Sequence, residues 1–391
     1  MNGMSIEIQK FDFSVVMPCL NEELTIGKCI EIAYESALAA GYKIEVIVAD
    51  NGSTDNSVVI AEECGAKVVR VAQRGYGAAL DSGIRSVSTD YVVIADCDLS
   101  YNLAAASTFY QRLIEDDLDL VVGNRFKGGI SRGAMPPLHK YFGNPVLSGI
   151  ARTMFSIPLR DFHCGIRGFK LSTYLAANPK TKGMEFATEM VLRFVELNAV
   201  ISEIPTTLAP DGRDRKPHLR SFPDGWRHLK LMLLFAPQFF LMLPGAFLTF
   251  LGFALLTEYF VFSEIDLILG KTDVQGGFLA MLISSIGVQL FSAGAVSVAH
   301  AKAKGVNRFK WLPITYSSNR AKFAIFFPIT LIVIGLSLLG KVLVDWKMSQ
   351  YGHLNPVLES RFSYLGGAIF LAGFTLFLGA IQVRQIISRF W

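Results

Sequence analysis

Four long apolar stretches in the C-terminal part of the chain constrain its fold more than any other feature. They cover residues 239–262, 276–300, 323–344 and 364–383. A helix rises about 1.5 Å per residue, so about 20 residues cross a hydrocarbon core of about 30 Å. Buried helices of a soluble core are the alternative, but the hydrophobic share of 51% and the mean hydropathy of +0.39 are too high for an ordinary soluble protein. We therefore predict a transmembrane domain with four spans over residues 239–391.

The loops between these stretches predict the orientation of the chain in the membrane. The connection over residues 301–322 contains no acidic residue, whereas residues 263–275 are net acidic. The positive-inside rule places a loop of this kind in the cytoplasm. With four spans, the N-terminal domain and the C-terminus then lie on the cytoplasmic side as well. The basic residues of the loop are Lys302, Lys304, Arg308, Lys310, Arg320 and Lys322.

A short segment, residues 224–238, joins the more polar N-terminal part of the chain to the first span. It places Trp226 beside Arg227 and Lys230, and Pro237 interrupts the apolar run that follows. A tryptophan among basic residues and leucines suits a helix that lies at the membrane interface. The cytosolic end of the first span is the alternative interpretation.

Charge and cysteine content narrow the function less than hydropathy does. The net charge of +4 excludes no class of partner by itself, and we predict no nucleic-acid partner and leave a homo-oligomer open. All five cysteines precede residue 224 and none belongs to a Cys-x-x-Cys pair, which predicts reduced thiols rather than a zinc site or disulfides. The first 13 residues lack the apolar core of a signal peptide.

The N-terminal domain, residues 1–223, alternates short β-branched runs with helical segments. The runs cover residues 13–17, 44–49, 67–71 and 91–95, and helices fit residues 25–40 and 57–64 between them. Continuous apolar runs of this length are typical of strands buried in a parallel sheet. The pattern predicts an α/β doubly wound domain whose ligand binds at the carboxyl ends of the strands.

Polar clusters follow three of these strands. They are residues 18–23, residues 50–55 and the Asp96-Cys97-Asp98 motif. Carboxylates that flank a single residue after a strand can hold Mg²⁺ or Mn²⁺, which substrate phosphates commonly complete. Asp-x-Asp alone is frequent and often only a solvated turn, so its place beside the other clusters is what indicates a site. Gly75, which opens a helical segment, either lets backbone approach a donor phosphate or simply starts the helix.

The motifs resemble glycosyltransferase family 2 in their order and spacing. They are Val-Met-Pro-Cys-Leu-Asn-Glu-Glu, Ala-Asp-Asn-Gly-Ser-Thr-Asp, Gly-Tyr-Gly-Ala-Ala and Ala-Asp-Cys-Asp-Leu-Ser. Later blocks over residues 123–129 and 161–169, and Glu189, resemble the polyprenyl-phosphate glycosyltransferases, such as dolichyl-phosphate mannose synthases and undecaprenyl-phosphate glucosyltransferases. The resemblance covers about residues 13–210. It implies a GT-A nucleotide-sugar-binding domain with a Rossmann-like, mostly parallel sheet.

Site residues follow from the resemblance at the matching positions. It implies that Asp98, with Arg125 and Arg132 at an acceptor loop, takes part in catalysis, and that Asp96 and Asp98 bind the metal ion and the donor diphosphate. Members often have Gln two places after the second Asp, where this chain has Ser100, and the usual basic block is altered over residues 212–218. The residues implied to contact the donor are Pro18, Leu20, Glu22, Asp50, Asn51 and Asp96.

A lipid phosphate acceptor is an anion, so its binding site needs cationic side chains. The planar guanidinium group of arginine can bind two phosphate oxygens at once. The resemblance implies the inverting transfer of a hexose from a nucleotide sugar, UDP-hexose or GDP-mannose, to undecaprenyl or dolichyl phosphate at the cytoplasmic face of the membrane. Any single candidate is more often a surface charge than a phosphate ligand, so the prediction rests on the group as a whole. The candidates for the acceptor phosphate are Arg125, Arg132, Lys140, Arg167, Arg213 and Arg215.

Two other functions share some of these features. A processive polysaccharide synthase usually has a Gln-x-x-Arg-Trp motif and spans before the catalytic domain, and neither is present in this sequence. A glycolipid transporter with a nucleotide-binding domain would need a polar pathway, but the spans hold few ionisable residues, chiefly Glu258. We interpret the bundle as an anchor, and residues such as Phe370, Gly373, Phe374 and Gly379 as packing residues rather than a polyprenyl groove.

Overall fold

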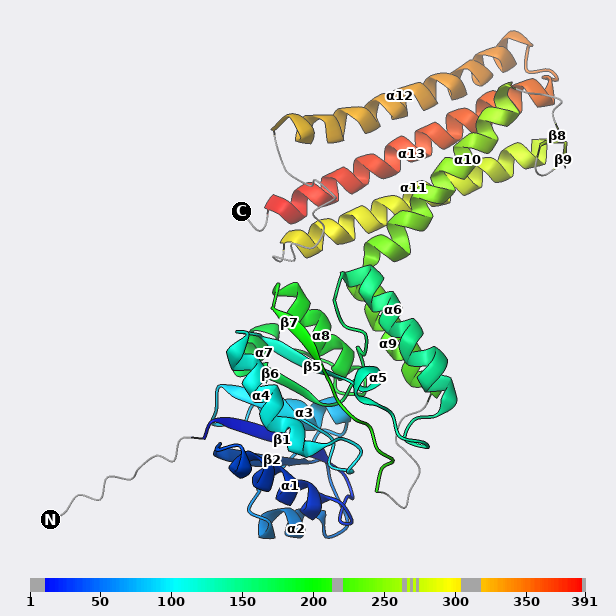
Figure 1. The fold of residues 1–391 in the computed structure, drawn as a ribbon. Helices are drawn as coiled ribbons and strands as arrows, with labels where there is room; N and C mark the ends of the chain where they lie inside the picture. The colour runs from blue at the N-terminus through cyan, green and yellow to red at the C-terminus, as the bar shows by residue number, and fades with distance from the viewer. Residues whose placement is uncertain are drawn as a thin grey trace. The chain divides into compact units, whose positions relative to one another are not determined.

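The computed structural model describes residues 11–212, 221–261, 266–267, 270–271, 274–303 and 318–388. The chain divides into two compact units, the first ending at Phe235 and the second beginning at Ala236. The first unit contains an α/β domain and the second contains the apolar helices (Figure 1).

The first unit is built on one seven-stranded sheet with the strand order β3-β2-β1-β4-β6-β5-β7. Neighbouring strands run parallel except at β6, which is antiparallel to both β4 and β5. The mostly parallel α/β architecture of the GT-A type is thus confirmed. The strands are β1 (Phe13–Cys19), β2 (Ile44–Asp50), β3 (Lys67–Arg70), β4 (Tyr91–Ile94), β5 (Leu120–Asn124), β6 (Arg167–Lys170) and β7 (Ile201–Pro205).

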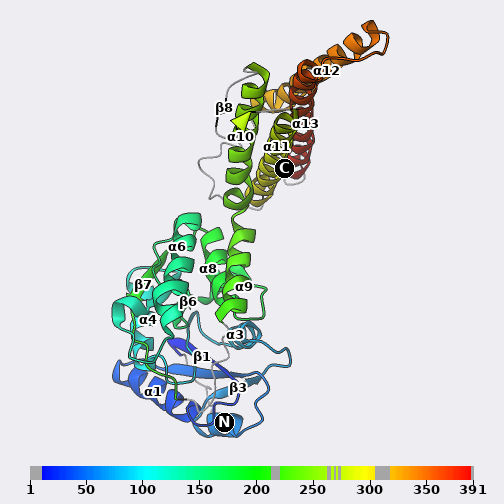
Figure 2. The ribbon, with the colours of Figure 1, turned by 90° about the vertical axis from the view of Figure 1, so that its right-hand side faces the viewer.

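Helices cover both faces of this sheet (Figure 2). α1 (Ile26–Ala39) packs against α2 (Ser57–Glu63) and α4 (Ala106–Glu115), and α3 (Tyr76–Ile84) packs against β1, β2 and α8 (Phe186–Glu196). Burial on both faces explains why β1 and β2 are continuous apolar runs, since nearly every residue in them is buried. The remaining elements of the unit are η1 (Leu103–Ala105), α5 (Arg125–Gly128), η2 (His139–Gly143), α6 (Asn144–Phe155), α7 (Leu171–Ala177) and α9 (Ser221–Phe235).

The segment predicted to lie at the membrane interface is largely α9, which belongs to the first unit. α9 packs against α8, with His228 buried and Trp226 61% exposed. The Nδ1 atom of His228 lies 2.7 Å from the hydroxyl oxygen of Thr188 on α8. One side of α9 therefore completes the first unit, and its contact with a membrane stays a prediction.

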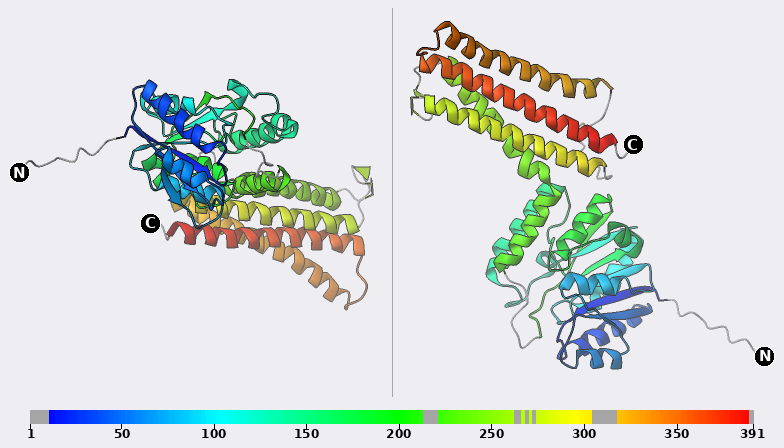
Figure 3. Two further views of the ribbon diagram at one scale, coloured as in Figure 1. Left: turned by 90° about the horizontal axis from the view of Figure 1, so that it is seen from below. Right: turned by 180° about the vertical axis from the view of Figure 1, so that it is seen from behind.

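The second unit consists mainly of four long helices that lie alongside one another (Figure 3). Each has the length and apolar composition of a membrane span, over residues 239–261, 274–300, 323–348 and 356–386. The last two helices extend beyond the predicted apolar stretches. The elements are η3 (Gln238–Met242), α10 (Leu243–Val261), β8 (Asp266–Leu267), β9 (Gly270–Lys271), α11 (Val274–Ala303), α12 (Ser318–Met348) and α13 (Pro356–Ser388). The basic loop used to predict orientation lies largely outside the described residues.

Glycines let these helices approach closely. A Cβ atom on Gly252 of α10 would lie 2.3 Å from the backbone nitrogen of Ser284 on α11. One on Gly373 of α13 would lie 2.8 Å from the backbone nitrogen of Ile332 on α12, which confirms the packing role expected of Gly373. Small residues at helix crossings are how membrane helices maximise van der Waals contact.

Candidate active site

The polar clusters after β1 and β2 meet at one edge of the sheet. β1, β2 and β4 are parallel neighbours, so their carboxyl ends lie together. The side-chain oxygen of Asn21 accepts a hydrogen bond from the backbone N–H of Thr54 at 2.7 Å, and the Ser53 hydroxyl accepts one from the N–H of Asn21 at 2.9 Å. The backbone N–H of Glu22 donates to the Ser57 hydroxyl at 2.7 Å. The predicted strand-end grouping is present.

The Asp96-Cys97-Asp98 turn follows β4 at this same edge, and hydrogen bonds of Cys97 hold it in place. The Thr25 hydroxyl donates to the carbonyl oxygen of Cys97 at 2.7 Å, and the Cys97 thiol donates to the carbonyl oxygen of Pro18 at 3.0 Å. Asp98 is only 6% exposed. Its Oδ1 atom accepts hydrogen bonds from both the backbone N–H and the hydroxyl of Ser100. Ser100, whose role the sequence left open, therefore orients the Asp98 carboxylate.

Asp96 accepts a hydrogen bond from a residue of α3. The hydroxyl of Tyr76, the first residue of α3, donates to Oδ1 of Asp96 at 3.1 Å. Burial and the neighbouring Asp96 carboxylate raise the pKa of Tyr76 well above its ordinary value, so this hydroxyl keeps its proton. Gly165 lies on the other side, where a Cβ atom would come within 2.9 Å of Oδ2 of Asp96. A larger residue at position 165 would displace the carboxylate.

These two carboxylates fit a magnesium or manganese site that the substrate completes. Among the described residues, no group of three or more His, Cys, Asp and Glu side chains could hold a metal ion by itself. Mg²⁺ usually binds through one or two carboxylates together with substrate phosphates and water. Asp96 and Asp98 could supply carboxylate oxygens of that kind, whereas softer metals prefer thiolate ligands.

The other residues implied to contact the donor also hold the loops around the site. Asp50, 5% exposed, accepts hydrogen bonds from the backbone N–H groups of Gly52 at 3.2 Å and Ser53 at 3.0 Å. Asn51 donates to the carbonyl oxygen of Gln73 at 2.8 Å and accepts from the N–H of Gly75 at 2.7 Å. Asp50 and Asn51 thus shape this edge of the sheet, and their contact with a donor stays a prediction.

Arg125, expected near the phosphates, forms a buried ion pair with Asp161. Its Nε and Nη2 atoms donate to the two carboxylate oxygens at 2.7 and 2.8 Å, and its Nη1 atom donates to the Tyr101 hydroxyl at 3.4 Å. Arg125 is 8% exposed and Asp161 fully buried. Burial alone would lower the pKa of Arg125, but Tyr101 and Asp161 raise it well above its ordinary value. The guanidinium is therefore held firmly in its charged form.

Three of the other predicted acceptor residues lie in the described part of the chain, and their side chains differ in exposure. Arg167 has no exposed surface and donates to the carbonyl oxygens of Phe162, Cys164 and Ala187, so in this arrangement it supports a loop rather than a basic surface. Arg132 is exposed, and Lys140 of η2 is partly exposed. Arg213 and Arg215 lie outside the described residues.

Comparison with known proteins places this domain in a family. The model of "Glycosyl transferase family 2" matches residues 14–174, which contain β1 except its first residue, β2 to β6 and the Asp96-Cys97-Asp98 turn. The "Low-salt glycan biosynthesis hexosyltransferase Agl6" of Haloferax volcanii is 35% identical over 287 residues, or 73% of this chain and 68% of that protein. The chain belongs to glycosyltransferase family 2. The "Dolichyl-phosphate hexose transferase" of the same organism is 30% identical over 196 residues, covering 50% of this glycosyltransferase and 81% of that protein.

Among solved structures, glucosyl-3-phosphoglycerate synthase from Mycobacterium tuberculosis, in complex with Mn²⁺, UDP and glucosyl-3-phosphoglycerate, aligns with a TM-score of 0.46 and 20% identity. The alignment covers 58% of this glycosyltransferase and 80% of that chain.

An exposed apolar patch adjoins Lys140 in the glycosyltransferase domain. We call Leu138, Tyr141, Phe142 and Val146, on η2 and its flanks, the η2–α6 patch. Tyr141 is 75% and Phe142 63% exposed, and Lys140 lies 5.6 Å from the centre of the Tyr141 ring. η2 is a π-helical turn that leads directly into α6, so these side chains stand on one continuous helical segment. Sequence reasoning found Lys140 here but missed the aromatic residues.

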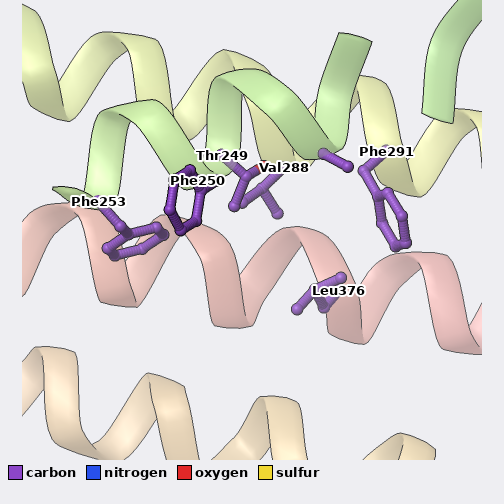
Figure 4. A pocket seen from close by; sticks show the side chains of 7 residues that line it. Thr249, Phe250, Phe253, Val288, Phe291 and Leu376 are labelled. Atoms are coloured by element: carbon purple, nitrogen blue, oxygen red, sulfur yellow. The ribbon is translucent and has the colours of Figure 1, made fainter. Parts of the chain in front are cut away.

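The apolar helices of the glycosyltransferase contain a recess of about 470 Å³ between α10, α11 and α13 (Figure 4). Its one polar lining side chain, Thr249, donates to the carbonyl oxygen of Gly245 in its own helix. The lining that the described residues provide is therefore almost wholly apolar. The lining residues are Ala246, Thr249, Phe250, Phe253, Val288, Phe291 and Leu376.

Proposed function

We propose that this glycosyltransferase transfers a hexose from a nucleotide-diphosphate sugar to a polyprenyl phosphate at the cytoplasmic face of the membrane, with inversion at the anomeric carbon. The observation that carries the proposal is the Asp96-Cys97-Asp98 turn, anchored at the carboxyl edge of the sheet in a chain with four helices of membrane-span length. Two relatives named for hexose transfer, one of them acting on dolichyl phosphate by its name, support the choice of sugar and acceptor class.

On the donor side, Asp96 and Asp98 would hold Mg²⁺ or Mn²⁺ against the diphosphate. The metal ion supplies charge neutralisation to the departing nucleoside diphosphate. The protein's own contribution is to hold the two carboxylates ready, through Ser100 at Asp98 and Tyr76 at Asp96. Groups fixed in advance need no reorganisation when charge develops on the leaving group.

On the acceptor side, a lipid phosphate is already anionic near neutral pH, so no side chain has to remove a proton from it. A phosphate oxygen attacks the anomeric carbon, the bond from that carbon to the diphosphate breaks, and the nucleoside diphosphate leaves with the electron pair. The protein must align the two substrates and offset the repulsion between their phosphates. Among the described candidates, the exposed Arg132 and the partly exposed Lys140 are available for this.

The η2–α6 patch supports a lipid acceptor over a soluble one. Aromatic and aliphatic side chains beside a lysine suit the boundary between headgroups and hydrocarbon, where the apolar part is buried and the charge stays in water. An exposed apolar patch on a soluble surface, in contrast, favours association with another protein. Arg125, held by Asp161 close to Tyr101, would contribute positive charge from beneath the surface.

The experiment that tests the proposal incubates purified protein with UDP-glucose, UDP-N-acetylglucosamine or GDP-mannose, Mg²⁺ or Mn²⁺, and undecaprenyl or dolichyl phosphate. Mass spectrometry of the lipid fraction should show one added sugar for at least one donor. Polymer instead of a single sugar would favour a polysaccharide synthase. Movement of glycolipid across liposome membranes without glycosylation would favour a transporter.

A further inference from the structure

Glu189 is a buried carboxylate that none of the proposed roles uses. It lies on α8 and is 2% exposed. Its Oε2 atom accepts hydrogen bonds from the backbone N–H groups of Lys180 at 2.8 Å and Thr181 at 2.7 Å, and its Oε1 atom accepts one from Nε of Arg193 at 3.2 Å. Burial would raise the pKa of Glu189, but the hydrogen bonds from these three residues lower it, so the carboxylate is charged at neutral pH.

The segment that Glu189 holds, residues 180–182, packs on the first turn of α3. The carbonyl oxygen of Lys182 accepts hydrogen bonds from the N–H groups of Gly77 at 2.9 Å and Ala78 at 3.2 Å. A Cβ atom on Gly75 would lie 2.2 Å from this same oxygen, and one on Gly77 would lie 2.8 Å from the carbonyl oxygen of Thr181. The two glycines are therefore needed for this close contact between backbones, which explains the Gly-Tyr-Gly sequence.

The first turn of α3 leads directly to the acidic turn. Tyr76, between the two glycines, donates to Asp96 at 3.1 Å, and the N–H of Gly75 donates to Asn51 at 2.7 Å. A continuous series of contacts thus runs from Glu189 through residues 180–182 and Tyr76 to Asp96.

We propose that Glu189 is a positioning residue, which sets the Asp96 carboxylate for metal binding by fixing residues 180–182 and, through them, Tyr76. The inference rests on the proposed function, because the role of Asp96 as a metal ligand belongs to it. Partners outside the immediate metal ligands commonly change metal affinity by about 10–100-fold when they are replaced.

Glu189→Gln tests this with little change of shape. An amide has one acceptor oxygen and one donor NH₂ group, so either the two backbone N–H groups or the Arg193 guanidinium would face a donor. Residues 180–182 should lose part of their support, and Tyr76 should hold Asp96 less firmly. We expect the dissociation constant for Mn²⁺ to rise about tenfold, at the lower end of the range for such partners.

The matched control is Glu196→Gln. Glu196 ends the same helix and accepts from Nη1 of the same Arg193 at 3.0 Å, but its side chain is 24% exposed and no contact joins it to residues 180–182 among the described hydrogen bonds. An effect of weakening the Arg193 interactions in general would appear in both variants. An effect carried to Asp96 should appear only at Glu189.

The experiment titrates Mn²⁺ into the full-length protein with UDP or with GDP present, and follows free Mn²⁺ by electron paramagnetic resonance. Glu189→Gln and Tyr76→Phe should each raise the dissociation constant about tenfold, and the double variant should equal roughly one single variant, because both interrupt the same series of contacts. Should Glu189→Gln not fold, Glu189→Asp, which keeps the charge but shortens the reach, replaces it.

Equal Mn²⁺ affinity for Glu189→Gln and wild type, or effects that multiply in the double variant, would overturn the inference. Failure of the proposed function looks different, since wild-type protein would then form no metal-dependent glycolipid, whatever the behaviour of Glu189. In Glu189→Gln the Michaelis constant for the nucleotide sugar should also rise, whereas the Michaelis constant for polyprenyl phosphate should stay unchanged.

Discussion

Replacing Asp161 by asparagine should destabilise the glycosyltransferase domain strongly, because it leaves the charge of Arg125 buried without its partner. Asp161 is fully buried and accepts from two guanidinium nitrogens at 2.7 and 2.8 Å and from the backbone N–H of Arg125 at 3.0 Å. Removing one member of a buried ion pair costs about 3–5 kcal/mol. For a unit of this size, at about 2–4 °C per kcal/mol, the melting temperature of the domain should fall by about 6–20 °C.

Asp117→Asn provides the matched control. Asp117 pairs with Lys170 at the same 2.7 Å, but its side chain is 93% exposed. Exposed pairs add little to stability, so this variant should melt with the wild type. Thermal unfolding of the full-length protein in detergent, followed for the domain transition in both variants, makes the comparison. Equal melting temperatures for Asp161→Asn and Asp117→Asn would refute the reasoning that burial decides the effect.

A paired substitution then separates the structural role of Arg125 from its proposed role in catalysis. Arg125→Met with Asp161→Leu removes both charges together, and apolar replacements of buried ion pairs are often neutral or stabilising. The double variant should therefore regain the melting temperature that Asp161→Asn loses. If Arg125 also supplies charge to the phosphates, the stable double variant should still transfer sugar poorly; transfer at the wild-type rate would remove that role.

Three further predictions concern single positions. Gly75→Ala should lower the melting temperature more than Gly52→Ala, because both glycines have positive φ, 133° and 94°, but only at Gly75 would the Cβ atom meet backbone, 2.2 Å from Lys182 O; equal shifts would contradict the close contact. Ser100→Ala should raise the Mn²⁺ concentration needed for half-maximal transfer several-fold, since Asp98 loses a hydroxyl donor; an unchanged requirement would show that Ser100 does not orient Asp98. Burial and the charges of His228, Arg167 and Arg125 hold the pKa of His163 well below the ordinary histidine value of about 6.5, so the unfolded chain binds this proton first and stability should decline as pH falls below about 6.5. The difference between the melting temperatures at pH 8 and pH 5.5 should therefore be smaller in His163→Gln than in the wild type. An equal difference in the two proteins would assign the pH dependence to other groups.

The sequence predicted the central strands well because they are buried on both faces. β1, β2 and β4 are short apolar runs, and their ends, like those of the partly exposed edge strand β3, agree with the prediction to within about two residues, an error typical of strand boundaries. β5, β6 and β7 were not among the predicted strands. For β6 the reason is local. It has four residues, includes Arg167 and Gly168, and is antiparallel within a mostly parallel sheet, so no run of apolar residues marks it.

The ends of the long apolar helices were less predictable, because hydropathy measures apolar character rather than helix formation. α13 begins at Pro356, whereas the apolar stretch begins at residue 364. The side-chain oxygen of Asn355 accepts from the N–H groups of Val357 at 3.1 Å and Leu358 at 3.2 Å, which caps the helix. The Asn-Pro pair is a recognisable start signal for a helix.

In the candidate site, too, the sequence predicted some features and missed others. Asp96 and Asp98 were predictable because local sequence, a strand followed by two close carboxylates, places them at the sheet edge. The pairing of Arg125 with Asp161 was not, since these residues are 36 positions apart and their meeting depends on the tertiary fold. Tyr76 was overlooked because the flanking glycines drew attention to a phosphate loop, whereas the structure uses them to bring the backbone close to residues 180–182.

The central claim is that Asp96 and Asp98 serve metal-dependent transfer of a sugar to a lipid phosphate. Its most direct test is the mass of the lipid product formed by wild-type and Asp98→Asn protein, both shown to fold and insert, with and without Mn²⁺. We predict one hexosyl unit on polyprenyl phosphate for the wild type with Mn²⁺ only, and none for Asp98→Asn. Wild-type turnover by Asp98→Asn, or no glycolipid from the wild type with any donor, would contradict the claim.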